Sequence, residues 1–434
     1  MANTNKKFKF GYGNEERIQA AVDAGKFDGG DLILTKNTHR FAFIDTTTNE
    51  LFFTKAQIET FEVDHSEVTK VSLELVHPHK QQINCEAVLM SGSTPLEGIE
   101  RELIYVENCE EINLIDVEDK IVLLEGRIFH SVYKKLINAK VAGFIALSGT
   151  IYDDNDNTDL NINQIRVHDY SLGYIPGVTI RALDGQMLAS LKGAKVRLTL
   201  IQNQSKRLSQ NVICEIKGNK HPEEIIAFTA HYDSVRFSTG AYDNASGTIG
   251  ILCLLDYFTN NKPDRTLKFI WCGSEECGLL GSKAYCIEHE KELENYRLNV
   301  NIDMLGVILR HEIAVVTGET SLVNYIDFIA KEIGIACKVS QGVYSSDSTP
   351  FADRGIPSIS FARISPQTGA QIHSRKDILS PLNANNFNST LSLITAFSNR
   401  VINSVYFPIK KVIPQNMKDE LDYYLLRKEK PTNN

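Results

Sequence analysis

Acidic and histidine side chains follow two apolar, strand-like runs of the sequence, residues 225–229 and 267–271. One imidazole and four carboxylates are concerned: His231, Asp233, Asp243, Glu275 and Glu276. Open α/β sheets place their sites at the carboxyl ends of the strands, where the chain passes into loops. We therefore expect these five groups to meet at one edge of a sheet, where they could bind metal or transfer protons.

Five residues have the side chains and the positions of metal ligands: His231, Asp243, Glu276, Asp303 and His373. Zinc binds imidazole nitrogen and carboxylate oxygen, and a catalytic zinc site keeps one position for water. Two imidazoles and three carboxylates suit two ions that share one carboxylate, and such a pair can hold a hydroxide and polarise a carbonyl together. Taken singly, each residue is equally well a hydrogen-bonded histidine, a turn residue or a helix-terminal acid. If all five residues had these simpler roles, their common placement after a strand or in a loop of one domain would have to arise by chance five times.

Strand-like and helix-like segments alternate from residue 209 onward. Helices are predicted over 246–259, 279–294, 322–333 and 384–405, with apolar strands between them. This alternation indicates an α/β fold in which a mostly parallel central sheet is sandwiched by helices. Such a sheet would bring the candidate ligands together, because they follow different strands.

Composition limits the class of protein. The 434 residues carry a net charge of −8 and are 42% hydrophobic and 23% charged, as in ordinary soluble globular proteins. The sequence has no basic run that could neutralise phosphates, which argues against a nucleic-acid partner. It also has no apolar stretch of about 18 residues, which argues against a membrane span. The amino terminus lacks the apolar core of a secretory signal, and eight cysteines are scattered, so we expect reduced thiols and a cytoplasmic location.

The candidate ligands lie in motifs that resemble a known family, the di-zinc exopeptidases related to bacterial leucyl aminopeptidases, glutamate carboxypeptidase and the transferrin receptor. The motifs are H-Y-D-S at 231–234, A-Y-D-N-A-S-G at 241–247, S-E-E-C-G-L-L-G-S at 274–282, N-I-D-M-L-G at 301–306 and I-H-S-R-K-D at 372–377. The resemblance implies that His231 and Asp303 bind one zinc ion. It implies that Glu276 and His373 bind the other ion, and that Asp243 bridges both.

The resemblance implies two further catalytic residues that do not bind metal. Glu275 would be the general base that takes a proton from the metal-bridging water and returns it to the leaving amine, which is typically worth about 10² to 10⁴ in rate. Asp233 would accept the other ring hydrogen of His231. The family also has a cis peptide after its bridging aspartate, so we expect one at Asp243–Asn244.

The segment S-S-D-S-T-P-F at 345–351 departs from the family pattern, because serine occupies position 348, where the family commonly has histidine. Asp347 is predicted to lie near the site, and Tyr344 is a candidate for stabilising the oxyanion. Both are proposed as substrate-binding residues. Cys277 directly follows a candidate ligand, and we interpret it as a packed small residue, since five ligands already fill two sites. Its position leads to the hypothesis that thiol-directed reagents inhibit the protein.

Four parts of the chain are predicted: a β-rich N-terminal segment of unknown role (1–68), a protease-associated-like domain (69–205), the catalytic domain (206–408), and a C-terminal helix and tail (409–434). The second part rests on D-K-I-V-L-L-E-G, N-A-K-V-A-G-F-I-A-L and Y-I-P-G-V-T-I, which resemble the protease-associated domain inserted in several exopeptidases. A short helix is predicted over 14–25 in the first part.

These features favour a di-zinc aminopeptidase that releases N-terminal residues from peptides, at a site that would also accept Co²⁺ or Mn²⁺. A carboxypeptidase or dipeptidase is the rival, because Arg363, Arg375 and Lys376 are close in sequence to His373 and could bind a terminal carboxylate. A non-catalytic, receptor-like binding protein is disfavoured, because every ligand and the general base are present. Peptide is the expected partner, no nucleic acid or membrane partner is expected, and a homo-oligomer is left open.

Overall fold

The computed structural model describes residues 33–34, 40–44, 51–126, 128–153, 160, 163–366 and 369–429. The helix predicted over 14–25 therefore lies outside the described residues. The chain forms two compact units, which are described one at a time. The larger unit comprises residues 209–429 and the described residues before Glu62, and the smaller unit comprises residues 62–208.

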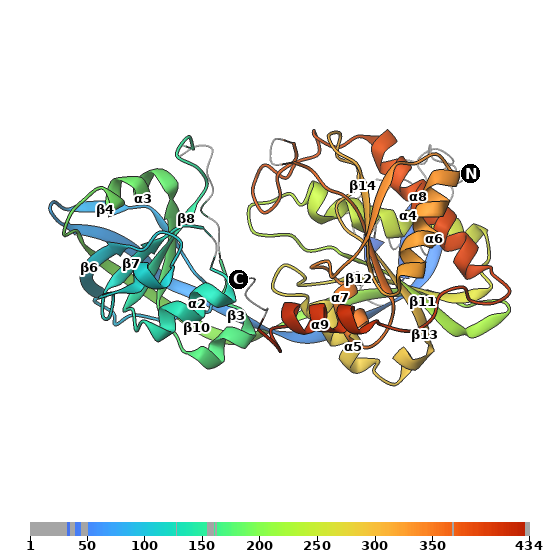
Figure 1. Ribbon diagram of the computed structural model, residues 1–434, viewed down its shortest axis with the longest axis horizontal. Helices are drawn as coiled ribbons and strands as arrows, with labels where there is room; N and C mark the ends of the chain where they lie inside the picture. Colours follow the sequence, from blue (N-terminus) through green and yellow to red (C-terminus); the bar gives the residue numbers. More distant parts are fainter. Residues whose placement is uncertain are drawn as a thin grey trace. The chain divides into compact units, whose positions relative to one another are not determined.

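A central sheet organises the larger unit (Figure 1). Its strands lie in the order β15 (Cys337–Gln341), β14 (Glu312–Thr317), β16 (Ser358–Arg363), β13 (Tyr296–Ile302), β11 (His221–His231), β12 (Arg265–Cys272) and the end of β10 (Lys195–Ile216). Neighbouring strands are parallel except for β14 with β16 and β10 with β12. The mostly parallel sheet predicted from the alternating pattern is thus confirmed.

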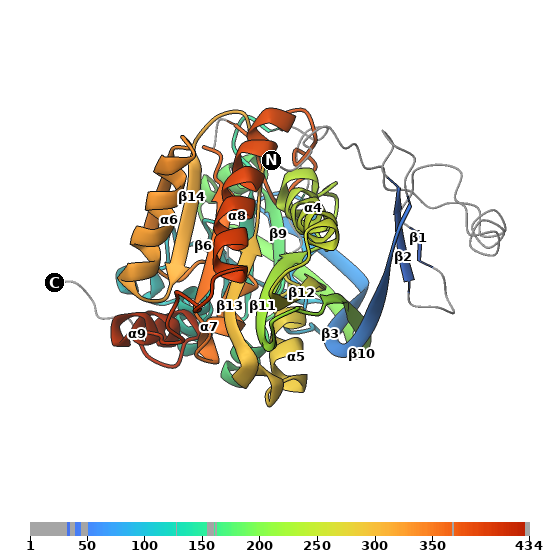
Figure 2. The ribbon, with the colours of Figure 1, turned by 90° about the vertical axis from the view of Figure 1, so that its right-hand side faces the viewer.

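Helices cover both faces of this sheet because its inner strands are apolar on both faces. In β11, Phe228 and Ala230 belong to one core and Ile225 and Ala227 to another, as expected when successive side chains point in opposite directions. The first face packs against α4 (Ser246–Asn260), α6 (Thr320–Glu332) and α8 (Ala384–Ile402), which lie on the same side of the strands in Figure 2. The second face packs against α5 (Leu280–Glu288) and α7 (Ser348–Asp353).

Two elements differ from the sequence-based expectation. The helix predicted over 279–294 is shorter, since α5 ends at Glu288 and a separate 3₁₀ turn spans Glu292–Asn295. The six-residue helix α7 was not predicted, because its serine, threonine and proline residues are typical of a turn. The peptide bond Asp243–Asn244 is cis, as expected from the family resemblance.

The smaller unit has its own α/β core. Strands β6 (Ile99–Tyr105), β7 (Ile121–Leu124), β8 (Gly143–Ser148) and β9 (Gly177–Arg181) are parallel, and β5 (Cys85–Ala87) pairs antiparallel with β9. The two faces pack against α2 (His130–Asn138) and α3 (Ala182–Ala189). The strands β3 (Leu51–His77) and β10 contribute residues to both units. No helix in the described part of the chain is long and apolar enough to cross a membrane.

Candidate metal centre

The candidate ligands lie at the carboxyl ends of neighbouring strands in the larger unit. His231 is the last residue of β11, Asp303 directly follows β13, and Glu276 follows β12 in the next loop. Asp243 precedes α4, and His373 lies in the loop after β16. Because β12, β11 and β13 are adjacent and parallel, their carboxyl ends share one edge of the sheet. The structure therefore brings together all five residues predicted as ligands.

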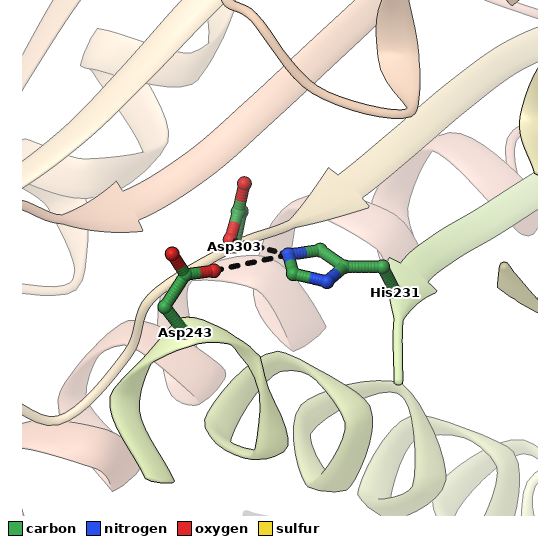
Figure 3. A group of neighbouring side chains, drawn as sticks. All are labelled: His231, Asp243 and Asp303. Carbon is green, nitrogen blue, oxygen red and sulfur yellow. Dashed lines mark ion pairs between the residues drawn. The ribbon is translucent and has the colours of Figure 1, made fainter. Parts of the chain in front are cut away.

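These residues form two groups that share Asp243. In the first, His231 Nε2 lies 3.1 Å from Asp243 Oδ1 and 3.5 Å from Asp303 Oδ1, and Figure 3 shows the three side chains pointing toward one another. In the second, His373 Nε2 lies 3.2 Å from Asp243 Oδ2 and 3.0 Å from Glu276 Oε2. The two oxygens of Asp243 thus face different groups.

The spacing and the chemistry of both groups fit a metal ion. A tetrahedral zinc ion with ligand distances of about 2.0–2.1 Å separates neighbouring ligand atoms by roughly 3.3 Å. The four nitrogen-to-oxygen distances lie on either side of this value, between 3.0 and 3.5 Å. Within the described part of the chain, Asp303 Oδ1 is moreover buried without a hydrogen-bond partner, which is costly unless a cation lies beside it.

The electrostatics of the cluster also favour bound cations. Burial by itself would lower the pKa of His231, but the charges of Glu275, Asp243 and Asp303 raise it well above its usual value. Burial would raise the pKa of Asp243, but His231 and His373 lower it below its usual value. Burial and neighbouring carboxylates raise the pKa of Asp303 and of Glu275, so these acids repel other negative charges in the cluster, and divalent ions would relieve this repulsion.

Asp233 contacts His231 through its backbone and the loop after β12 through its side chain. The ring Nδ1–H of His231 donates to the backbone carbonyl of Asp233 over 2.9 Å, whereas the carboxylate Oδ1 is 3.8 Å from Nδ1. The prediction that Asp233 accepts this hydrogen is therefore confirmed, and the accepting atom is the backbone carbonyl oxygen. The chain turns after β11 so that the carbonyl meets the ring and the carboxylate reaches the next loop. There it accepts the N–H of Glu275 at 3.0 Å and of Glu276 at 3.3 Å.

Comparison with known proteins identifies the family of the part of the chain that carries this cluster. Residues 211–398 match peptidase family M28. This segment of the chain belongs to that family. Aminopeptidase YwaD of Bacillus subtilis is 34% identical over 315 residues, which are 68% of this chain and 64% of that protein. Leucine aminopeptidase 2 of Arthroderma otae is 30% identical over 322 residues, or 70% and 58% of the two chains. The chain thus spans less than two thirds of the length of these relatives.

Solved structures agree with the M28 assignment. A zinc aminopeptidase from Bacillus subtilis superposes with a TM-score of 0.66 at 25% identity, and the match covers 83% of this chain and 87% of that one. A peptidase M28 precursor from Shewanella amazonensis superposes with a TM-score of 0.67 at 20% identity, over 83% and 86% of the two chains. The second similarity supports the fold.

Two residues of the M28 segment that support the cluster were given no role in the sequence analysis. Asp377 is fully buried, and its carboxylate accepts the N–H of Tyr242 at 2.7 Å and of Asp243 at 3.0 Å. The side chain of Asn244 accepts the N–H of Met304 at 3.1 Å, which links the loop of Asp243 to the loop after β13. The feature of the sequence that could have identified these two residues is their place in the motifs at 241–247 and 372–377.

Replacing Asp377 with asparagine is expected to weaken metal binding by about 10- to 100-fold, the usual effect of losing a residue that orients a ligand. The amide of asparagine has one acceptor oxygen, so one of the two N–H groups loses its partner. Competition with a chelator measures this affinity. The matched control is Asp327→Asn, on the exposed side of α6. Equal affinities in the two variants would contradict the supporting role of Asp377.

The segment 344–348 of the M28 domain contains the two predicted substrate-binding residues, Tyr344 and Asp347, and also Ser348. Tyr344 is half-buried, and its pKa is raised by burial and by the charges of Asp303 and Asp243. Asp347 is 1% exposed, and burial raises the pKa of its carboxyl to about 6. Their roles in substrate binding stay predictions. Ser348, where the family commonly has histidine, is buried, and its hydroxyl oxygen accepts the hydroxyl hydrogen of Ser360 at 2.9 Å.

Cys277 is expected to react with alkylating reagents before the other seven cysteines of the chain. It is exposed, whereas the others are buried or half-buried, so the interpretation of Cys277 as a packed small residue is wrong. An adduct here would displace the adjacent Glu276 and so lower metal binding. We expect N-ethylmaleimide to remove most bound metal from the wild type while Cys277→Ser retains it. Equal sensitivity of the two proteins, read by metal content and by mass spectrometry of the labelled peptide, would disprove this.

Proposed function

We propose that this protein is an aminopeptidase that holds two zinc ions and removes N-terminal residues from peptides. The observation that carries the proposal is the placement of Asp243, whose two oxygens face separate groups of ligands. Relatives described as aminopeptidases, including a zinc aminopeptidase of known structure, support the reaction class.

Five residues would hold the ions: His231 and Asp303 one of them, Glu276 and His373 the other, and Asp243 both. When bound, such ions polarise a peptide carbonyl and lower the pKa of water. The second group is more open to solvent, since the side chain of His373 is 30% exposed and that of His231 is 3% exposed. We therefore expect the peptide to approach from the side of His373. Co²⁺ or Mn²⁺ would serve the same ligands.

Glu275 would move protons during the reaction. It belongs to neither ligand group, yet its charge is felt by His231, and burial raises the pKa of its carboxyl well above the usual value. A general base with a raised pKa accepts a proton readily near neutral pH. The carboxylate of Asp233 holds the N–H of Glu275 and of Glu276, so one short loop would direct one glutamate to metal and the other to the reacting water.

Carboxypeptidase or dipeptidase activity is the alternative, and Arg363, one of its candidate cations, is held by contacts within the fold. Arg363 donates from Nε to the carbonyl of Val307 at 2.6 Å and from Nη1 to Glu312 at 2.7 Å. Arg375 and Lys376 are exposed and stay candidates for binding a terminal carboxylate. Carboxypeptidase Q of Xenopus laevis is 24% identical over 311 residues, so a test must compare both ends of the substrate.

Dipeptides blocked at one end test the choice directly. An aminopeptidase should hydrolyse the carboxyl-blocked dipeptide and leave the amine-blocked one intact, because its site pairs acidic groups with a free amine. Cleavage of the amine-blocked substrate alone would favour the carboxypeptidase. Metal analysis accompanies the assay, and a protein without metal or activity after reconstitution with zinc or cobalt would instead be a binding protein. A panel of aminoacyl chromogenic substrates, with and without chelator, then defines the side-chain preference.

The remaining expectations from the sequence stay proposals. We propose that residues 69–205 form a protease-associated-like domain, which the separate α/β core of residues 62–208 supports. The cytoplasmic location, the homo-oligomer and the role of residues 1–68 stay predictions of the sequence analysis.

A further inference from the structure

The C-terminal helix α9 (Gln415–Tyr424) lies beside α7 in both Figure 1 and Figure 2. Met417 and Leu421 of α9 form a buried apolar cluster with Ala352 of α7 and Ile413, and Val343 packs against this cluster. Residues 341–353, here called the 341–353 segment, contain α7 and the loop before it. The packing therefore places the end of the chain against a segment that carries Tyr344.

Three polar pairs tie α9 and the residues after it to the beginning, the middle and the end of the 341–353 segment. They are Asn416–Gln341 at 3.2 Å, Tyr424–Ser345 at 2.6 Å, and Arg427–Asp353 at 2.6 and 2.7 Å. Three contacts spread along a segment restrain it more than a single contact does. Without them, the parts of the segment between contacts would keep more of their backbone conformational entropy.

The pair Arg427–Asp353 has the geometry of a strong restraint. The two guanidinium nitrogens each donate to one carboxylate oxygen, and the carboxylate side chain is only 13% exposed. Single exposed ion pairs contribute little to stability, but two parallel bonds also set orientation. This pair therefore adds a directional contact at the end of α7 to the apolar packing of Phe351 and Ala352.

A hydrogen bond couples the position of Tyr344 to that of α7. Thr349, in the first turn of α7, donates its hydroxyl to the carbonyl of Tyr344 over 2.9 Å. The same segment contacts the strand beside Asp303: the hydroxyls of Ser346 and Ser360 are 2.8 Å apart, and Phe361, the residue after Ser360, accepts the N–H of Asp303 at 3.0 Å. A shift of α7 would therefore move Tyr344 and the contact between Ser346 and the strand that ends beside Asp303.

We propose that α9 is a positioning element of the active site, which acts through Tyr424 and Arg427 to hold the 341–353 segment, and with it Tyr344, at the metal centre. The inference rests on the proposed peptidase function. Tyr424 and Arg427 are positioning residues, because they act through Ser345 and Asp353.

The test compares Arg427→Ala with Lys428→Ala. Both side chains are 51% exposed, but Lys428 pairs with Asp419 and Asp422 of α9 itself and so leaves the 341–353 segment untouched. We expect Arg427→Ala to lower kcat by roughly tenfold, since a misplacement of about 1 Å can cost up to 10²-fold. Bound metal should not change. Amide hydrogen exchange within residues 341–353 should become faster in Arg427→Ala alone, and Arg427→Lys, which keeps the charge, should restore part of kcat.

Equal kcat and equal exchange in Arg427→Ala and Lys428→Ala would overturn the inference, and so would faster exchange with unchanged kcat. A lower kcat with equal exchange would also overturn it, because the segment would not have moved. If Arg427→Ala does not fold, Tyr424→Phe removes a single hydroxyl and is judged by the same two measurements. A metal-loaded wild type that cleaves no peptide would overturn the proposed function and this inference with it, whereas the outcomes above concern an active enzyme.

Discussion

Replacing Glu275 with glutamine is expected to lower kcat by about 10² to 10⁴-fold, the usual contribution of a general base, while the protein keeps its metal. The amide cannot accept the proton, yet it preserves the size of the side chain. Glu275 belongs to neither ligand group, and its loop is held through backbone N–H groups that the substitution leaves in place. Turnover of an aminoacyl chromogenic substrate and metal content, measured on the same sample, check both halves of the prediction.

The matched comparison is Glu276→Gln, one residue along the same loop. Glu276 Oε2 faces His373 at 3.0 Å and belongs to the second ligand group, so this variant should lose metal as well as activity. If instead Glu275→Gln loses metal and Glu276→Gln keeps it, the roles of the two glutamates are exchanged. If Glu275→Gln keeps full turnover, another group is the base.

Replacing Asp243 with asparagine is expected to have the largest effect on metal content. Each of its two oxygens faces a different ligand group, so the amide nitrogen would replace an oxygen ligand in one group and the lost charge would weaken both. Both ions should be lost, whereas His373→Ala should affect mainly one of them. Since bound metals contribute several kcal/mol to transition-state stabilisation, the rate should fall by about 10³-fold or more.

Elemental analysis of the purified variants distinguishes a shared carboxylate from two separate sites. The control is again Asp327→Asn, which removes one carboxylate charge from the surface and should keep wild-type metal and rate. An Asp243→Asn protein that keeps one ion at full occupancy would show that the carboxylate belongs to a single group. Circular dichroism and melting temperature, measured on each variant, separate loss of metal from loss of fold.

The sheet and its reactive edge were predictable because the information for them is local. The apolar runs of β11 and β12 are continuous, which is typical of strands buried on both faces, and the reactive residues follow directly after them. Contacts that depend on the path of a loop were not predictable in the same way. The sequence places Asp233 two residues after His231, but whether its carbonyl or its carboxylate meets the ring depends on how the chain turns.

What the sequence by itself determined is the set of reactive residues, the strands that precede them and the family motifs that contain them. What only the tertiary structure decided is which atoms meet. Asp377 reaches the backbone of Asp243 across 134 positions, and Arg427 reaches Asp353 across 74. Such pairs form only after the sheet and helices have packed, and periodicity along the chain carries no signal for them. For that reason the candidate ligands could be named from motifs, and the side chains that hold them in place could not.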